Sequence, residues 1–133
     1  MSMGNKYGAH RVIEPKGLLP QAAQKIDNTM EIYDNEILID VSALNIDSAS
    51  FRQLWAASEQ DEARLRDMIL GIVAERGKMQ NPVTGSGGML MGTIAQIGSA
   101  LQHRKDIKAG DRIASLVSLS LTPLHIEEIL AVH

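Results

Sequence analysis

The chain has 133 residues, no cysteine and a formal net charge of −3, so it fits one domain without disulfides or thiol chemistry. Its acidic and basic residues are interspersed and no apolar run approaches the roughly 18 residues of a membrane span, which argues against nucleic acid and membranes as partners. With one Trp, two Tyr and one Phe, the core must be built from aliphatic side chains, and we expect a soluble, cytoplasmic protein.

The first 28 residues are predicted to form an extended arm that wraps around the rest of the domain. Turn-forming residues interrupt it at Gly8, Pro15, Gly17 and Pro20. Between them, Arg11–Glu14 is the only stretch with the character of a strand.

A strand is predicted over Glu36–Ala43, because Ile37, Ile39 and Val41 alternate with charged or small residues. This alternation predicts one buried face. The polar segment Asn45–Ser50 then offers several side chains that could cap a helix. A short helix is expected to follow over Phe51–Ala56.

The clearest helix is predicted from Ser58, as its cap, to Arg76. Its apolar residues recur at helical spacing and should face the core: Leu65, Met68, Ile69, Ile72 and Val73. Gly77 follows, and a glycine can end a helix in the left-handed conformation at low cost.

The last third predicts a glycine-rich turn over Asn81–Gly88 and strands over Met89–Ile97 and Arg112–Leu121. Thr122-Pro123 favours the start of a final short helix, with proline at its first position. The fold class that follows is mainly β with helices, an α+β fold.

The glycine-rich turn is a weak candidate for a phosphate site. Phosphate-binding loops and dinucleotide fingerprints lead into a helix, whereas Gly85–Gly92 leads into a strand. A tight structural turn or the wall of a substrate cleft is the favoured interpretation. The sequence therefore assigns no cofactor-binding residue.

The histidines do not predict a metal site. His10, His103, His125 and His133 share no spacing of two to five residues, and there is no cysteine to complete a zinc site. We therefore assign no metal ligand, and no catalytic base is identified either.

The polar corner of Asn45, Asp47 and Ser48 is a better candidate for ligand binding. It lies between a predicted strand and a predicted helix, where loops on a rigid scaffold often carry ligand groups. The simpler alternative is favoured about two to one: Asp47 or Ser48 caps the helix and Asn45 forms a turn.

The order of glycines in the last third resembles the GroES-like substrate domain of medium-chain dehydrogenases. The resemblance rests on the glycine turn before a strand that ends in Ile97-Gly98, followed by Gly110-Asp-Arg-Ile113. It implies a GroES-like, partly open β-barrel with an inserted helical segment at about 47–76. The zinc-ligand positions of that family fall on or next to Asp47 and on Gly87-Gly88-Met89, so the resemblance implies a zinc-free member.

Longer blocks resemble the N-terminal region of the L-erythro-3,5-diaminohexanoate dehydrogenase family over nearly the whole chain. These blocks are His10–Gly17, Leu19-Pro20, Lys25–Glu31, Leu44–Phe51, Gly77–Met79, Asn81–Gly88 and Leu116–Leu124. The resemblance implies an enzyme of lysine fermentation that oxidatively deaminates 3,5-diaminohexanoate to 5-amino-3-oxohexanoate with NAD or NADP. The nucleotide would be bound mainly by a Rossmann-type domain, or a second subunit, outside residues 1–133.

The same resemblance implies a site for the diamino acid substrate. We expect Asp47 to contact an ammonium group, Asn45, Ser48 and Ser86 to position the substrate, and Arg11 to pair with the substrate carboxylate. We expect a homo-oligomer and little hydride transfer by this chain alone. Two other functions stay open: a zinc-free quinone-oxidoreductase-like domain and a stand-alone GroES-like association module without catalysis.

Overall fold

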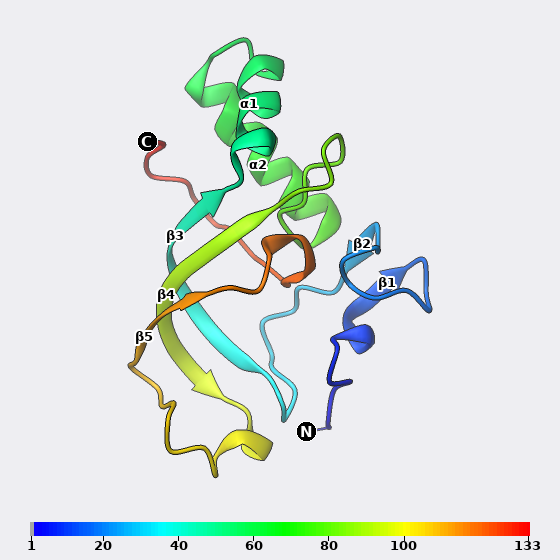
Figure 1. Ribbon diagram of the computed structural model, residues 1–133, viewed down its shortest axis with the longest axis vertical. Helices are drawn as coiled ribbons and strands as arrows, with labels where there is room; N and C mark the ends of the chain where they lie inside the picture. Colours follow the sequence, from blue (N-terminus) through cyan, green and yellow to red (C-terminus); the bar gives the residue numbers. More distant parts are fainter. Residues whose placement is uncertain (1) are drawn as a thin grey trace.

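A computed structural model describes residues 2–133 and shows an α+β fold with two antiparallel sheets and two α-helices (Figure 1). The small sheet pairs β1 (Val12–Glu14) with β2 (Lys25–Ile26). The larger sheet has the order β3-β4-β5. Within residues 2–133 these strands do not close into a barrel, so the prediction of a partly open α+β fold is confirmed.

The long antiparallel pair of β3 (Ile37–Ile46) and β4 (Gly88–Ile97) is the backbone of the larger sheet. It places Ile37 opposite Ile97 and Ile46 opposite Gly88. β5 (Arg112–Ser115) pairs with the middle of β4. Both long strands were predicted, but β3 continues three residues beyond the predicted end at Ala43, into the polar corner.

The predicted helical segment at 47–76 is confirmed as α1 (Ser48–Ala57) and α2 (Glu62–Arg76). Ser58 was wrongly predicted to cap the second helix. It lies at the C-terminal end of α1, and the side chain of Asp61 caps α2 by accepting the Arg64 N–H at 3.2 Å. α2 ends as predicted at Gly77, whose φ of 74° is left-handed.

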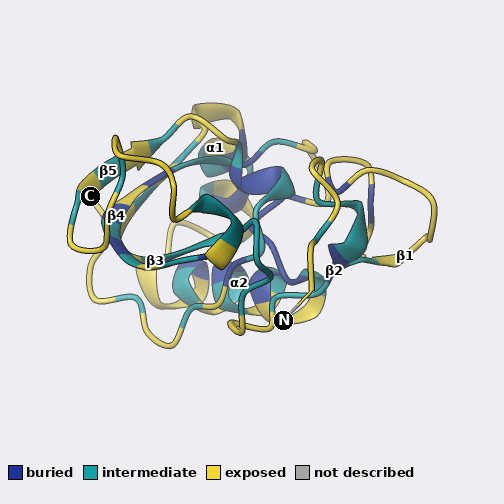
Figure 2. Cartoon of the chain, turned by 90° about the horizontal axis from the view of Figure 1, so that it is seen from below, coloured by how far each residue is buried: buried dark blue, intermediate teal, exposed yellow. Residues whose placement is uncertain are grey.

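The core lies where the two helices meet one end of the larger sheet (Figure 1). In Figure 2 the peripheral loops are exposed, whereas the helices carry buried residues on part of their surface. Three residues of the predicted α2 stripe, Leu65, Ile69 and Val73, are buried there, and Met68 and Ile72 pack against them. The other buried members of this core are Leu54, Met79, Leu90, Leu119 and Leu124.

The prediction that β3 buries one whole face is wrong. Residues 40–43 are all exposed, and Val41 is 40 % exposed although it belongs to the predicted apolar face. The helices cover only the end of β3 that leads into α1, as Figure 1 shows. No layer in residues 2–133 covers the middle of the strand.

The predictions for the C-terminal part were partly wrong. The strand that begins at Arg112 ends at Ser115 rather than Leu121, and Leu119–Leu121 form a 3-10 turn, η3. The Ser118 hydroxyl accepts the Ser120 N–H at 3.2 Å, which favours this turn over a continued strand. The helix predicted from Thr122-Pro123 does not form. Residues 122–133 instead run in irregular conformation alongside α2.

The arm over residues 1–28 contains more structure than was predicted in the part that is described. β1 confirms most of the strand-like stretch Arg11–Glu14, but its partner β2 was missed, because two residues are too few for a visible alternation. Among residues 2–133 there is no helix with the length and apolar character needed to cross a bilayer.

Candidate functional site

The pairing of β3 with β4 brings the predicted polar residues into one corner. The main-chain N–H of Asp47 donates to the Gly87 carbonyl oxygen at 2.9 Å, immediately beyond the paired residues Ile46 and Gly88. Ser86 therefore lies next to the Asn45–Ser48 segment, although some 40 residues separate them in the sequence. We call Asn45, Asp47, Ser48 and Ser86 the polar corner.

Gly88 allows the two strands to approach at this corner. Its φ is 153°, and a Cβ atom at this position would overlap the Asn45 carbonyl oxygen. The glycine-rich segment leads into β4 and not into a helix, in keeping with its interpretation as a tight turn. Its main-chain N–H groups therefore do not stand at the N-terminus of a helix.

The carboxylate of Asp47 is available to a ligand. Asp47 occupies the N-cap position of α1, but its side chain accepts no hydrogen bond from the first turn of the helix. It is exposed, and it forms no ion pair with any of residues 2–133. Asp47 thus occupies the N-cap position, as the capping alternative predicted, but its side chain forms no capping hydrogen bond.

Residues with hydroxyl and amide side chains adjoin Asp47, two along the chain and one across the strand pair. Asn45 and Ser48 are exposed, and Ser86 is half-buried with its Oγ atom 2.8 Å from Thr84 Oγ1. A negative charge flanked by neutral hydrogen-bonding groups is suited to an ammonium group, which offers three N–H donors and one positive charge.

Arg11 does not belong to this corner. Only 4 % exposed, its guanidinium group donates to both carboxylate oxygens of Glu36, from Nε at 3.0 Å and from Nη2 at 2.6 Å. Its remaining N–H groups donate to the main-chain oxygens of Asp27, Thr29 and Glu31. All five donors of the guanidinium group are therefore engaged within the chain.

Arg11 and Asp47 also lie at opposite ends of β3. Glu36, the partner of Arg11, directly precedes this strand, and Asp47 directly follows it. Ten residues at roughly 3.3 Å per residue separate the two ends by about 30 Å of strand. Within this chain, one small substrate cannot contact both residues.

The cluster around Glu36 fastens the N-terminal arm to the start of β3. Burial raises the pKa of Glu36, but hydrogen bonds from Arg11, from the Tyr33 N–H and from His10 outweigh it and lower the pKa to about 2. His10 contacts Glu36 through Nε2 at 2.9 Å, while its Nδ1 accepts the Asn5 N–H at 2.9 Å. The arrangement is that of a structural clamp.

Sequence reasoning missed a group of buried polar residues directly after α2. Lys78, Gln80 and Asn81 are all buried, and Lys78 is 0 % exposed. The Lys78 ammonium group donates to the main-chain oxygens of Pro20 at 2.6 Å and Gln21 at 3.4 Å. Burial, helped by the charge of Arg76, lowers the pKa of Lys78 to about 8. No periodicity could reveal these residues, because the segment is neither helix nor strand.

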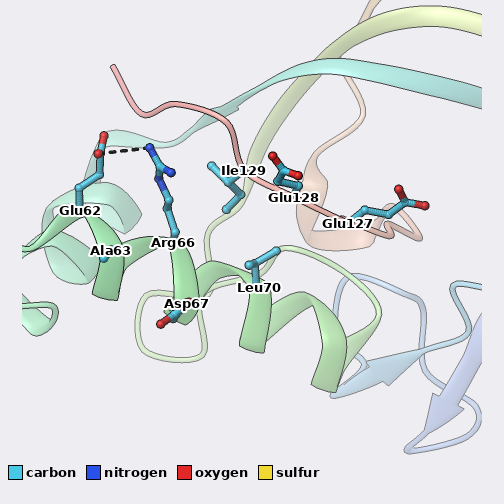
Figure 3. Close-up of a pocket in the computed structure, with 8 residues that line it drawn as sticks. All are labelled: Glu62, Ala63, Arg66, Asp67, Leu70, Glu127, Glu128 and Ile129. Atoms are coloured by element: carbon cyan, nitrogen blue, oxygen red, sulfur yellow. Dashed lines mark hydrogen bonds and ion pairs between the residues drawn. The ribbon is translucent and has the colours of Figure 1, made fainter.

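A separate surface groove of about 300 Å³ lies between α2 and the C-terminal segment (Figure 3). Arg66 lies in this groove and donates to Glu62 at 3.2 Å. None of the polar-corner residues lines it. The eight lining residues are Glu62, Ala63, Arg66, Asp67, Leu70, Glu127, Glu128 and Ile129.

The described residues do not form the fold on which dinucleotides are usually bound. Both sheets in residues 2–133 are antiparallel, so this part of the chain contains no βαβ unit, the element on which dinucleotide-binding folds are built. The same residues contain no group of three or more His, Asp or Glu side chains arranged for a metal ion.

Comparisons with known proteins agree on one family. The family model described as "L-erythro-3,5-diaminohexanoate dehydrogenase N-terminal domain" matches residues 10–133. A protein of Fusobacterium nucleatum with the name L-erythro-3,5-diaminohexanoate dehydrogenase is 64 % identical over 130 residues, which cover 98 % of this chain and 38 % of that protein. One of the same name from Acetoanaerobium sticklandii is 65 % identical over 127 residues, 96 % of this chain and 37 % of that protein. The chain thus spans somewhat more than a third of these relatives.

Proposed function

Because the chain belongs to the family of L-erythro-3,5-diaminohexanoate dehydrogenase N-terminal domains, we propose that it is the substrate-binding domain of such an enzyme. The reaction we propose is the oxidative deamination of L-erythro-3,5-diaminohexanoate to 5-amino-3-oxohexanoate, a step of lysine fermentation. The observation that carries the assignment of the site is the Asp47 carboxylate, which is unpaired among residues 2–133 and belongs to a residue whose main-chain N–H bonds to Gly87, next to Ser86.

The substrate carries two amino groups, and the proposal gives them different roles. The 3-amino group must be neutral when its carbon is oxidised, whereas the 5-amino group can remain a charged ammonium. We assign the charged group to Asp47, with Asn45, Ser48 and Ser86 as polar positioning residues. Arg11 is left out of this set, because its donors are all engaged at the other end of β3.

We further propose that NAD or NADP is held outside this chain. The relatives are more than twice as long as the matched region, which leaves room for a Rossmann-type domain, and a second subunit is the alternative. The nucleotide would accept the hydride. The chain's own residues would bind and orient the diamino acid, and we propose no metal for this step.

A fusion of this chain to the remainder of the Fusobacterium relative tests the proposal. The fusion should form reduced nucleotide from 3,5-diaminohexanoate. Asp47→Asn should raise KM for the diamino acid by about tenfold or more, because a hydrogen bond between charged groups contributes about 1.5–3 kcal/mol. Ser86→Ala should have a smaller effect in the same direction.

Asp40→Asn is the matched control for the Asp47 variant. Asp40 is also an exposed aspartate of the β3 region, but it lies in the middle of the strand, away from the corner. It should leave KM within about twofold, since it contributes no hydrogen bond to the substrate. An unchanged specificity constant in both Asp47→Asn and Ser86→Ala would contradict the assigned site. Turnover of quinones in place of the diamino acid would favour the quinone-oxidoreductase alternative.

A further inference from the structure

Asn81 is a fully buried amide at the start of the glycine-rich turn. Its Oδ1 accepts the N–H groups of Val83 at 2.8 Å and Thr84 at 3.4 Å. Its main-chain N–H donates to Ser86 O at 2.9 Å, and its carbonyl oxygen accepts the Gly85 N–H at 2.8 Å. These four bonds close the turn that carries Ser86.

The other end of the same side chain leaves the turn and reaches α1. Asn81 Nδ2 donates to Gln53 Oε1 at 2.9 Å and lies 3.4 Å from the Ser50 carbonyl oxygen. Ser50 belongs to the first turn of α1, two residues after Ser48 and three after Asp47. One buried amide therefore bonds both segments that carry the polar corner.

Strand pairing alone does not set the position of Ser86 against α1. The bond between Asp47 and Gly87 fixes two main chains, but residues 82–85 of the turn are exposed. The Gln80 side chain holds the far side of the turn through Gly85 O at 3.0 Å, and its other side-chain hydrogen bonds join Gln21 and Arg76 rather than α1. Among the hydrogen bonds of residues 2–133, the side-chain link between the turn and α1 is thus made by Asn81.

We propose that Asn81 is a positioning residue that sets the spacing between Ser86 and the Asp47–Ser48 side of the ammonium site. This inference rests on the proposed function, in which these residues bind the substrate. Asn81 itself does not contact the substrate, because it is 0 % exposed. It acts through the geometry of the residues on either side.

The test uses the fusion enzyme and exchanges the donor and the acceptor of the hydrogen bond between Asn81 and Gln53. Asn81→Asp keeps the acceptor that closes the turn but presents a carboxylate oxygen to the acceptors of Gln53 and Ser50. KM for the diamino acid should rise about tenfold with kcat changed less than about threefold, as expected when a buried hydrogen bond is lost. Gln53→Lys in addition supplies a new donor and should return KM to within about threefold of the parent.

Amide NMR signals of this chain provide a readout that does not depend on turnover. Asn81→Asp should shift the signals of both Ser48 and Ser86, and the double variant should move both back toward the parent values. If Asn81→Asp fails to fold, Gln53→Met removes only the acceptor on α1 and should raise KM about threefold.

The outcomes separate the two proposals. If Asp47→Asn raises KM while the Asn81 and Gln53 variants leave KM unchanged, the positioning role is overturned and the site stands. If Asp47→Asn and Ser86→Ala both leave the specificity constant unchanged, the assigned site fails, and if the parent fusion forms no reduced nucleotide from 3,5-diaminohexanoate, the proposed function fails. Ser48 signals that stay in place in Asn81→Asp while Ser86 signals move would also overturn the link. Lowered stability without the change in KM, or without recovery in the double variant, would show a structural role only.

Discussion

Lys78 places a charged group in the interior, where its hydrogen bonds go to main-chain oxygens of Pro20 and Gln21. A lysine in such a place is held in position by the chain around it, and its protonation is linked to folding. Its lowered pKa gives the sign of this linkage, because the folded protein binds the proton less tightly than the unfolded chain does.

The stability of the wild-type chain should therefore rise relative to Lys78→Met between about pH 8 and pH 10.5. Below pH 8 both states carry the proton and the cost of burying the charge is fully present. As the pH rises through the folded pKa of about 8 toward the ordinary 10.5, that cost is relieved by up to about 3 kcal/mol. Urea unfolding of both proteins at several pH values measures the difference. A difference that is constant with pH would contradict a buried, charged Lys78.

Glu36 predicts a dependence of the same sign, with stability rising as the pH rises, but in the acid range. Its folded pKa of about 2 lies below the ordinary 4.5, so its contribution is complete above pH 4.5 and is lost as the pH falls from 4.5 through 2. Glu36→Gln should cost about 3 kcal/mol at pH 7, because Arg11 stays buried without its carboxylate. Unfolding measured from pH 2 to pH 7 should show the two proteins converging at the acid end, and parallel curves would refute the clamp.

The stability of β4 depends on a glycine at its start, Gly88, whereas the stability of α2 does not require Gly71. Gly88→Ala should destabilise the chain by about 3 kcal/mol or more, since the new Cβ would overlap Asn45 O at the start of β4. Gly71→Ala is the control. It lies on α2 with no atom within 4 Å of the new Cβ, and it should stabilise the helix by up to about 1 kcal/mol. Thermal unfolding of both variants checks the pair, and an equal effect of the two would contradict the tight corner.

The elements that the sequence predicted well are those with a long periodic signal. The stripe from Leu65 to Val73 predicted α2, and the alternation that begins at Ile37 predicted β3. Short elements were not visible, because β2 has two residues and η3 depends on the Ser118 hydroxyl. The burial of β3 was wrongly predicted, since alternation shows which residues share a face but not whether another layer covers that face.

At the scale of the whole molecule, the sequence predicted the residues of the polar corner. It predicted neither the partner of Arg11 nor the contacts of Asn81. Asn45, Asp47 and Ser48 could be identified because a strand meets a helix there, and Ser86 joined them through the resemblance. The assignment of Arg11 to the substrate could not be checked before the fold was known, because its partner Glu36 is 25 residues away in the sequence. Asn81 has no periodic signal, and its importance comes from contacts with α1 that only the folded chain creates.

The length of β3 implies that its two polar ends can be altered separately. Glu36 and Asp47 share no partner and stand about 30 Å of strand apart, beyond the distance at which substitutions usually influence each other. The stability changes of Glu36→Gln and Asp47→Asn should therefore add in the double variant to within about 0.5 kcal/mol. If the proposed site holds, a redesign of substrate specificity at one extremity of this ribbon would leave the anchoring of the amino terminus intact.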